Sequence, residues 1–516
     1  MRLAAFLFVA VLTVSSALVA EEASVAEHSP IEAAPLETVS ESSDPEETTA
    51  PAPTAELLTL RQAQEIALRE NPSLAAVGLR VEQARQRIIQ ARSAYFPQAS
   101  LEYSATRTEL PDNTVDSLRN QAWLNIGPNA ARSSAFLIGG APSLLTVGST
   151  TAYTLGQGIR TALNVPTEVE TFEASLQLSY LVFDGFAREY TLRAAKLAEQ
   201  ESEAGRRDAQ RLLLFGVAQS YFGILLAKEN IAIAKADAAF NERLLQEARV
   251  SQEAGVASLS DVLNFEVRMR AAESNLIAAE AGLENARIAL AALLGMEGST
   301  LPEGVDVDPL AEESVEDLEL PEPDTVIASA LEHRPDLERA RYGVGRNKAF
   351  VGQARASFLP RVAAFAARSA SLPEHDFEGD DFSTTVGINA SVDLFTGGRQ
   401  WSQLKEAKLA TKQSERELDQ VELDAIAEVR QAWVSLGEAQ QQLVLQRTTA
   451  ELVQRNRDLV EKEFAAGQAA LVRLNEAQRD LVSATSRLAL ARVGLFLARQ
   501  ELEAATGENL LSLPVE

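Results

Sequence analysis

The chain has 516 residues, of which 46% are hydrophobic, and it contains 74 Asp and Glu, 47 Lys and Arg, three His and no Cys. The absence of cysteine excludes disulfides, thiolate metal sites, iron–sulfur clusters and cysteine nucleophiles. The histidines His28, His333 and His375 are isolated in the sequence, so we expect no histidine-based metal or catalytic cluster. A formal charge of −27 argues against nucleic-acid binding, which requires basic surfaces that displace counterions.

Residues 1–20 have the pattern of a secretory signal peptide, with a basic residue, an apolar run and small residues at the exit. We expect cleavage after Ala20, with Ala17 as the alternative. The apolar run is shorter than the ~20 residues that a membrane-spanning helix needs, so a membrane anchor is the weaker interpretation. Residues 21–56 are rich in Pro, Ser, Thr, Ala and Glu, and this composition predicts an acidic disordered tail.

Most of the remaining chain is an internal duplication, with a first repeat over residues 57–296 and a second over residues 325–510. Matches at an offset of 263 pair 67–74 with 330–337 and 90–97 with 353–360, and matches at an offset of 212 pair 183–185 with 395–397 and Gly255 with Gly467. The two offsets differ by 51 residues, which predicts an insertion of that length in the first repeat. The segment 297–324 between the repeats is acidic and contains prolines, and we expect an irregular connector there. Residues 511–516 form a short C-terminal tail.

Two short helices are expected at the start of each repeat. Thr59 and Gln62 form a capping-box pattern that opens the first of them. Asn71 is a favourable N-cap and Pro72 is tolerated at the first helical position, so a second helix is predicted over residues 72–95.

A long helix and a returning helix are expected to follow in each repeat. Proline-free segments rich in Ala, Leu, Glu, Gln and Arg predict helices over 188–252 and 399–464, and glycine turns separate them from helices over 259–294 and 471–506. At 1.5 Å per residue the long helix spans about 97 Å, close to the roughly 90 Å of the returning and short helices together. These lengths predict an elongated bundle, with one long helix beside two shorter coaxial ones.

Two β-strands are expected in each repeat, between the proline that ends the short helix and the Phe-x-Gly motif. The segments are Leu101–Ala105, Leu176–Val182, Ala363–Ala367 and Val386–Leu394. The alternation of apolar and polar residues, and a length near the roughly 9–11 residues of a membrane-spanning strand, favour a transmembrane sheet. A half-buried sheet of a soluble protein has the same pattern and stays open as an alternative.

Four spanning strands create a physical problem, because a four-stranded sheet cannot close and lipid offers no partners for its edge N–H and C=O groups. Several chains must therefore share one barrel. Three chains would give twelve strands, and their helices would form a tube continuous with that barrel.

This organisation resembles the TolC-like outer-membrane efflux protein family over about residues 57–510, in the doubled helix–strand–strand–helix unit and in the two glycine turns. The resemblance implies a mostly α fold with a small β part: a long α-helical coiled-coil barrel continuous with a trimeric 12-stranded transmembrane β-barrel, four strands per chain. It implies a trimeric channel-tunnel in the outer membrane of a Gram-negative bacterium. The tunnel would export small molecules or proteins with a periplasmic adaptor protein and an inner-membrane efflux or secretion pump.

The resemblance also implies that the two glycine turns lie at the periplasmic tip and contact the adaptor. The residues expected to do so are Gly255, Val256, Ser258, Leu259, Gly467 and Leu471. From the residues alone the same turns are ordinary helix hairpins, in which glycine ends one helix and serine caps the next.

Closure of the tunnel is expected at the same tip, but the family's closing network does not carry over intact. The family places an aromatic hydroxyl three residues before the second glycine, an arginine two residues after it, and acids six and nine residues after it. This chain has Phe464, Ala469, Arg473 and Glu476 at those places. Our hypothesis is that Arg473 engages Asp261 or Glu476 and, with Phe464, holds the tunnel shut. An exposed Arg473–Glu476 pair on one helix is the alternative.

The insertion in the first repeat, at about residues 111–166, is expected at the extracellular end of the barrel. Its glycines and Pro142 predict a loop or an extended hairpin.

Two other functions are weighed against the export channel: a periplasmic coiled-coil adaptor or scaffold, and a periplasmic hydrolase. We find no nucleophile elbow, phosphate loop or metal-ligand spacing, so neither enzymatic activity nor a cofactor is expected.

Overall fold

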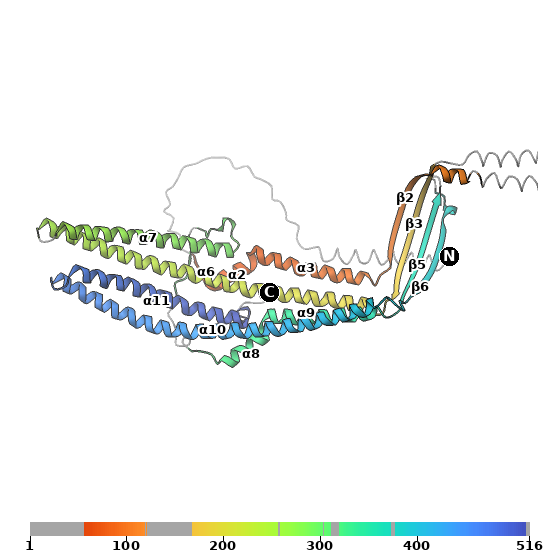
Figure 1. Cartoon of the computed structure of the whole chain (residues 1–516). Coiled ribbons are helices and arrows are strands. Elements are labelled where there is room, and N and C mark those ends of the chain that lie inside the picture. Colours follow the sequence, from red (N-terminus) through yellow and green to blue (C-terminus); the bar gives the residue numbers. More distant parts are fainter. Residues whose placement is uncertain are drawn as a thin grey trace, which may run out of the picture. The chain divides into compact units, whose positions relative to one another are not determined.

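The computed structural model describes residues 56–118, 120, 168–255, 258–302, 304–310, 319–372 and 377–511. They form two compact units (Figure 1). The sheet unit is drawn from residues 93–186 and 356–396, and the other described residues form the helical unit. Each unit takes segments from both sequence repeats, so the repeats are intertwined. The expected signal peptide, residues 21–55 of the tail and residues 512–516 lie outside the described part of the chain, and these assignments stay predictions.

The sheet unit contains four antiparallel strands in the order β2-β3-β5-β6. Their bounds are Gln98–Glu109 for β2, Glu168–Phe183 for β3, Arg361–Leu372 for β5 and Ser383–Ser391 for β6. They contain 12, 16, 12 and 9 residues, enough to cross a bilayer, for which about 9–11 residues suffice. In the described sheet β2 and β6 each pair on one side only, so the sheet has two open edges.

One face of this sheet is apolar and the other is polar. The register places cross-strand neighbours on the same face. The apolar face therefore contains Leu101, Tyr103, Leu176, Leu178, Tyr180, Ala364, Ala366, Val386 and Ile388, and also the polar residues Arg368 and Thr384 beside Leu176. Leu101 and Ile388 are 80% and 76% exposed, although both are large and apolar. An apolar face left this open in water would be unfavourable, and a surrounding lipid phase removes that cost.

The predicted strand at Ala363–Ala367 is part of β5, and the register decides which of its residues share a face. Pairing with β3 and β6 places Ala364 and Ala366 on the apolar face, whereas Phe365 projects from the polar face beside Gly387. A Cβ atom at Gly387 would lie 2.8 Å from the Phe365 ring, so the missing side chain makes room for this ring. Cross-strand packing therefore decides the orientation, which the alanine-rich sequence does not specify.

The predicted helices of the helical unit are confirmed, with bounds that differ by at most two residues. The long helices are α6 (Ala187–Glu253) and α10 (Arg399–Ala465), and the returning helices are α7 (Leu259–Leu293) and α11 (Leu471–Thr506). The shorter helices are α2 (Leu60–Glu70), α3 (Pro72–Ser93), α8 (Pro323–His333) and α9 (Pro335–Ala356). Figure 1 shows α7 beside α6 and α11 beside α10. The Thr59–Gln62 capping box is also present.

The segment expected to be an irregular connector contains regular structure, which corrects that expectation. Strand β4 (Val305–Val307) pairs in parallel with β1 (Glu56–Leu58), so Glu56 belongs to a strand as well. The Tyr221 hydroxyl donates to the Leu58 carbonyl at 3.0 Å and to the Asp308 carbonyl at 3.4 Å. These contacts from α6 attach the small sheet to the helical core, a tertiary effect that local composition does not reveal.

Two helices of the described residues, α6 and α11, are long and apolar enough to span a membrane by length and composition alone. Their best windows have mean hydropathies of 1.3 and 1.4. Val217 and Ile224 of α6 and Val493 of α11 are buried together in one hydrophobic cluster. Packing inside the helical unit therefore accounts for part of the apolar character of both helices.

The insertion begins differently from the predicted loop. Residues 112–118 are helical, and the amides of Thr114 and Val115 donate to the Pro111 carbonyl. Proline has a backbone angle that suits the start of a helix, which accounts for this short segment. Residues 121–167, including Pro142, lie outside the described residues, so the extracellular position of the insertion stays a prediction.

Candidate functional site

The first glycine turn joins α6 to α7. Gly255 has a φ of +77°, a left-handed conformation that ends α6 without the strain of a Cβ atom. Ser258 is the N-cap of α7: its hydroxyl accepts from the Asp261 amide at 3.2 Å, and the Asp261 carboxylate accepts from the Ser258 hydroxyl at 2.8 Å. Leu259 opens α7 and is 61% exposed. Val256, the remaining predicted contact residue of this turn, lies outside the described residues.

The second glycine turn joins α10 to α11 and is built differently. Gly467 has a φ of +73°, and the Glu463 carbonyl accepts from two amides of the turn. Ala470 is the N-cap of α11 and provides no side-chain hydrogen bond. Leu471 opens α11 and is partly buried. The first turn is therefore fixed by a side-chain cap, and the second by main-chain bonds and apolar packing.

Two of the polar residues assigned to tunnel closure, Arg473 and Asp261, have other partners in the described chain. Arg473 pairs with Glu463 at 3.1 Å, across the α10–α11 turn. Asp261 is engaged in the cap of α7. The predicted pairing of Arg473 with Asp261 or Glu476 is therefore absent from the described single chain. The reason is local, since the turn brings the end of α10 closer to Arg473 than the first hairpin.

A hydrophobic cluster, here called the tip cluster, holds the two helix hairpins together near their turns. Its buried residues are Phe240, Leu244, Leu245, Ala248, Val262, Phe265, Val460, Leu474 and Ala477. Phe464 packs against it and is partly buried. The guanidinium groups of Arg243 and Arg457 lie 5.4 and 5.5 Å from the Phe240 ring centroid, close enough for cation–π attraction. Phe464 therefore contributes to the contact between the two helix hairpins.

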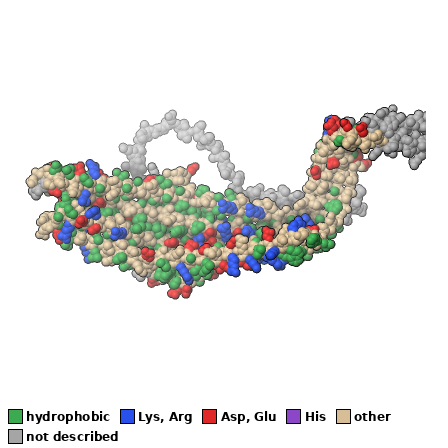
Figure 2. All heavy atoms as spheres, in the orientation of Figure 1, with side chains coloured by type: hydrophobic (Ala, Val, Ile, Leu, Met, Phe, Trp, Pro, Cys, Tyr) green, Lys and Arg blue, Asp and Glu red, His purple; other side chains and the backbone are tan. Residues whose placement is uncertain are grey.

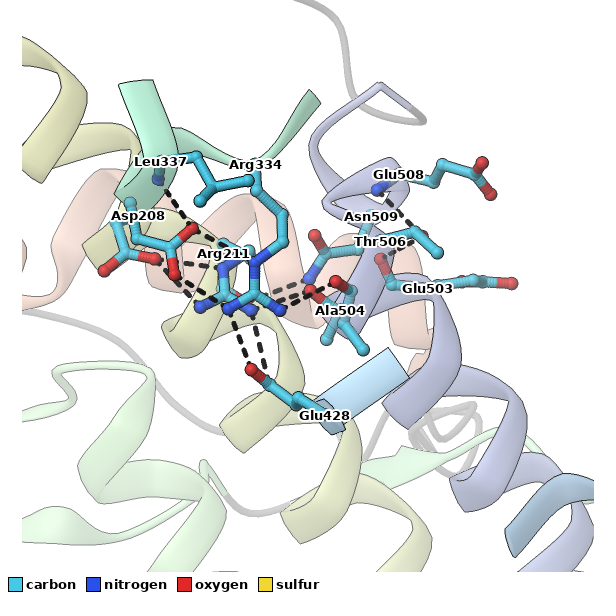
Figure 3. A network of polar contacts seen from close by, with 12 residues as sticks. Asp208, Arg211, Arg334, Leu337, Glu428, Glu503, Ala504, Thr506, Glu508 and Asn509 are labelled. Atoms are coloured by element: carbon cyan, nitrogen blue, oxygen red, sulfur yellow. Dashed lines mark hydrogen bonds and ion pairs between the residues drawn. The ribbon is translucent and has the colours of Figure 1, made fainter. Parts of the chain in front are cut away.

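A second polar site, which the sequence did not reveal, contains two buried arginines, Arg211 and Arg334 (Figure 3). Arg211 comes from α6, and its side chain is 4% exposed. It pairs with Asp208 at 2.9 Å and donates to the Ala504 carbonyl at 2.8 Å. The amide side chain of Asn509 donates in turn to the Arg211 carbonyl at 2.9 Å.

Arg334 lies between α8 and α9, and its side chain is 3% exposed. It pairs with Asp336 at 2.8 Å and donates to the Ala505 carbonyl at 2.9 Å. Glu428 of α10 accepts from Arg334 at 2.8 Å and lies 3.7 Å from Arg211, so both cations share this carboxylate. The buried arginine pair thus joins α6, α9, α10 and the end of α11.

The electrostatics of this site favour the charged forms. Burial lowers the pKa of Arg334, but its contacts with Asp336 and Glu428 outweigh burial and raise that pKa above the ordinary value. Burial raises the pKa of Asp336, whereas the hydrogen bonds and charge of Arg334 hold it below the ordinary value overall. A buried charge is costly without such partners, so the role of these groups is to position the helices.

The first repeat has an uncharged version of the same joint. Asn71, the equivalent of Arg334, donates to the Leu293 carbonyl at 2.8 Å, and Leu293 is the equivalent of Ala505. In both repeats a side chain at the junction of the two short helices therefore donates a hydrogen bond to a carbonyl at the end of the returning helix. The sequence signal for the ion pairs of Arg334 was that an arginine occupies the position at which the first repeat has the N-cap asparagine Asn71.

Neither site contains the elements of a reaction centre. Among the described residues, no three His, Asp or Glu side chains are grouped so that they could hold a metal ion. The contacts of both sites position helices relative to one another.

Comparison with known proteins gives consistent matches over most of the chain. A family model described as outer membrane efflux protein matches residues 64–296 and 326–508. The outer membrane efflux protein BepC of Brucella suis is 24% identical over 396 residues, which is 76% of this chain and 84% of the relative. The pyoverdine export outer membrane protein OpmQ of Pseudomonas aeruginosa is 27% identical over 410 residues, which is 76% of this chain and 83% of the relative.

The fold also has solved counterparts. The CmeC outer membrane channel of Campylobacter jejuni superposes with a TM-score of 0.68 at 17% sequence identity, over 92% of this chain and 94% of the other. A likeness at this identity concerns the fold, and it extends over most of both chains.

Proposed function

This chain belongs to the outer membrane efflux protein family, and we propose that three copies of it form a channel-tunnel that exports small molecules or proteins across the periplasm and the outer membrane. The observation that carries the proposal is the four-stranded sheet with two open edges and one exposed apolar face. In a bilayer each unpaired edge group costs several kcal/mol. Edge pairing between three copies satisfies these groups and gives twelve strands.

The polar face of the sheet would then line the lumen. It contains Ser100, Ser104, Ser175, Gln177, Ser179, Thr385 and Asn389, together with Glu102, Glu173 and Phe365. A pore lined mainly by small polar side chains hydrates well and selects weakly, which suits a duct whose specificity is supplied by a pump. The apolar face would contact lipid, as in other transmembrane barrels.

The helical unit would extend the duct into the periplasm. We propose that the two glycine turns form its periplasmic tip and bind a periplasmic adaptor protein through Gly255, Ser258, Leu259, Gly467 and Leu471, with Val256 adjoining. The exposed Leu259 and the capped, ordered start of α7 support this assignment. The adaptor in turn would link the tunnel to an inner-membrane efflux or secretion pump. The interpretation as an adaptor or scaffold is set aside, because the matched family is that of the outer membrane proteins themselves.

The absence of native cysteine allows a direct test of edge pairing. Ser100→Cys on β2 would be combined in turn with Thr385→Cys, Asn389→Cys and Ser391→Cys on β6, all on the polar face. Mild oxidation of the protein in native outer membranes should give covalent dimers and trimers for at least one pair. Single-cysteine variants serve as controls and should stay monomeric on a denaturing gel. A monomer that is stably embedded in lipid, by mass measurement in mild detergent, would contradict the proposal.

A further inference from the structure

A basic groove on the helical unit has no part in the tip or in the buried arginine pair. It lies between α6, α9 and α10 and has a volume of about 410 Å³. Four cations line it, Lys348, Arg355, Lys408 and Lys412, and no carboxylate does. Of these four cations only Lys348 has an ion pair with a described residue, Glu415 at 3.3 Å. Four cations gathered in a chain of charge −27 indicate an anionic ligand.

The floor of the groove is built by close packing. The ring of Tyr190 lies against Gly352, where a Cβ atom would be only 2.3 Å from the ring. Any larger residue at position 352 would displace Tyr190 and fill the floor. The groove is therefore a shaped depression between three helices, and the cations surround it.

The duplication provides an internal comparison. The equivalent positions in the first repeat hold Arg85, Arg92, Lys196, Glu199 and Gln200. There Arg85 pairs with Glu199 at 3.5 Å, so part of the charge is neutralised within the chain. The second repeat has Thr411 in place of that glutamate and Lys412 in place of the glutamine. The second repeat thus has four cations lining the groove and no carboxylate lining it, although Lys348 pairs with Glu415 outside the lining; Arg355, Lys408 and Lys412 have no ion pair among the described residues.

The position of the groove along the chain indicates what the anion belongs to. Leu394 and Phe395, which follow β6, are 92% and 88% exposed, and Trp401 in the first turn of α10 is 69% exposed. Trp401, Lys405, Lys408 and Lys412 share one face of α10, because they are spaced by four, three and four residues. Lys408 lies about 14 Å along the helix from its start. Exposed apolar and aromatic residues followed along the helix by several lysines are found where a protein leaves a bilayer.

Figure 2 shows Lys and Arg side chains along the lower edge of the helical unit, where α9 and α10 run. We infer that the basic groove binds the phosphate headgroup of an anionic phospholipid in the periplasmic leaflet of the outer membrane. The inference rests on the proposed function, because it takes the sheet unit as the membrane-spanning part. Lys and Arg near an anionic leaflet each favour such binding, and their long apolar stems let the charges reach the headgroup layer.

The test uses the full-length protein in nanodiscs of phosphatidylethanolamine and phosphatidylglycerol at a ratio of about 4:1. Native mass spectrometry after release from the nanodisc counts the phospholipids retained per assembly. The test variant combines Arg355→Gln with Lys408→Gln, and the matched control combines Arg92→Gln with Lys196→Gln, which removes the same charge at the equivalent first-repeat positions. None of these four cations has an ion pair among the described residues.

We expect the wild type and the control to retain phosphatidylglycerol in preference to phosphatidylethanolamine. In the test variant the ratio of retained phosphatidylglycerol to phosphatidylethanolamine should fall about tenfold, because each cation near the leaflet contributes a several-fold factor. Excess inorganic phosphate should not displace the lipid; displacement would identify a free-anion site and overturn the proposal. A wild type without preference, or an equal loss in the control, would overturn it as well. Conductance of the same samples reports separately on the proposed channel, so the two failures are distinguishable.

Discussion

At the scale of single residues, the buried arginine pair makes the sharpest prediction. Asp336→Asn removes the charge that faces Arg334, leaving a buried cation with Glu428 as its remaining charged partner. Breaking a buried ion pair by removing one partner is strongly destabilising, so we expect the free energy of unfolding to fall by about 3 kcal/mol. A urea titration followed by circular dichroism measures it. Asp419→Asn, which breaks the exposed Arg416–Asp419 pair, is the control and should change that free energy by less than about 1 kcal/mol.

The same pair has a defined pH dependence. The pKa of Asp336 is lower in the folded protein than the ordinary value near 3.8, so the pair stabilises the fold at pH values above that value. As the pH falls below it, the carboxylate of the folded protein becomes protonated and this stabilisation is lost. The difference in unfolding free energy between wild type and Asp336→Asn should therefore stay constant near neutral pH and shrink below about pH 4. A difference that grows on acidification would contradict the assignment.

At the scale of secondary-structure elements, the two returning helices differ in how they start. Ser258 caps α7, whereas Ala470 at the start of α11 has no capping side chain. We expect Ser258→Ala to weaken the first turn of α7 by about 1 kcal/mol, and Ala470→Ser to strengthen that of α11 by a similar amount. Amide hydrogen exchange of the two turns, measured by mass spectrometry, should rise in the first variant and fall in the second. Equal exchange in all three proteins would show that the turns are held by packing alone.

Elements were predictable where the signal is local, as for the helices. Thr59, Asn71, Gly255 and Gly467 mark helix starts and turns through their own backbone chemistry, and the structure follows these signals. Contacts between distant segments were not predictable. The orientation of Phe365, the β1–β4 pair and the buried position of Arg334 each depend on a partner that periodicity does not encode.

At the scale of the whole molecule, the candidate site was predicted less completely than the fold. Gly255 and Gly467 both have the left-handed conformation expected of a turn glycine, but only the first turn has a serine cap, and Arg473 pairs with Glu463, which precedes the same turn. Comparison with the family's closing network identifies which positions of this chain correspond to it. It does not reveal that Arg473 has Glu463 as a partner across its own turn. The part that Asp261, Phe464, Arg473 and Glu476 take in closure stays a prediction for the trimer.

The contact between Arg473 and Glu463 within one chain changes how closure of the tunnel should be tested. Arg473 and Glu463 are 60% and 30% exposed, so one pair contributes little to stability, but a trimer would hold three such pairs around one opening. In Arg473→Glu two carboxylates repel each other across the α10–α11 turn, and we expect the single-channel conductance of the reconstituted trimer to rise. The rise should be larger in about 0.01 M salt, where charges interact over roughly 30 Å, than in about 1 M salt, where they interact over roughly 3 Å. Adding Glu463→Lys should restore the low conductance. Restoration by Asp261→Arg instead would favour the contact between hairpins, and unchanged conductance in every variant would assign closure to apolar packing around Phe464.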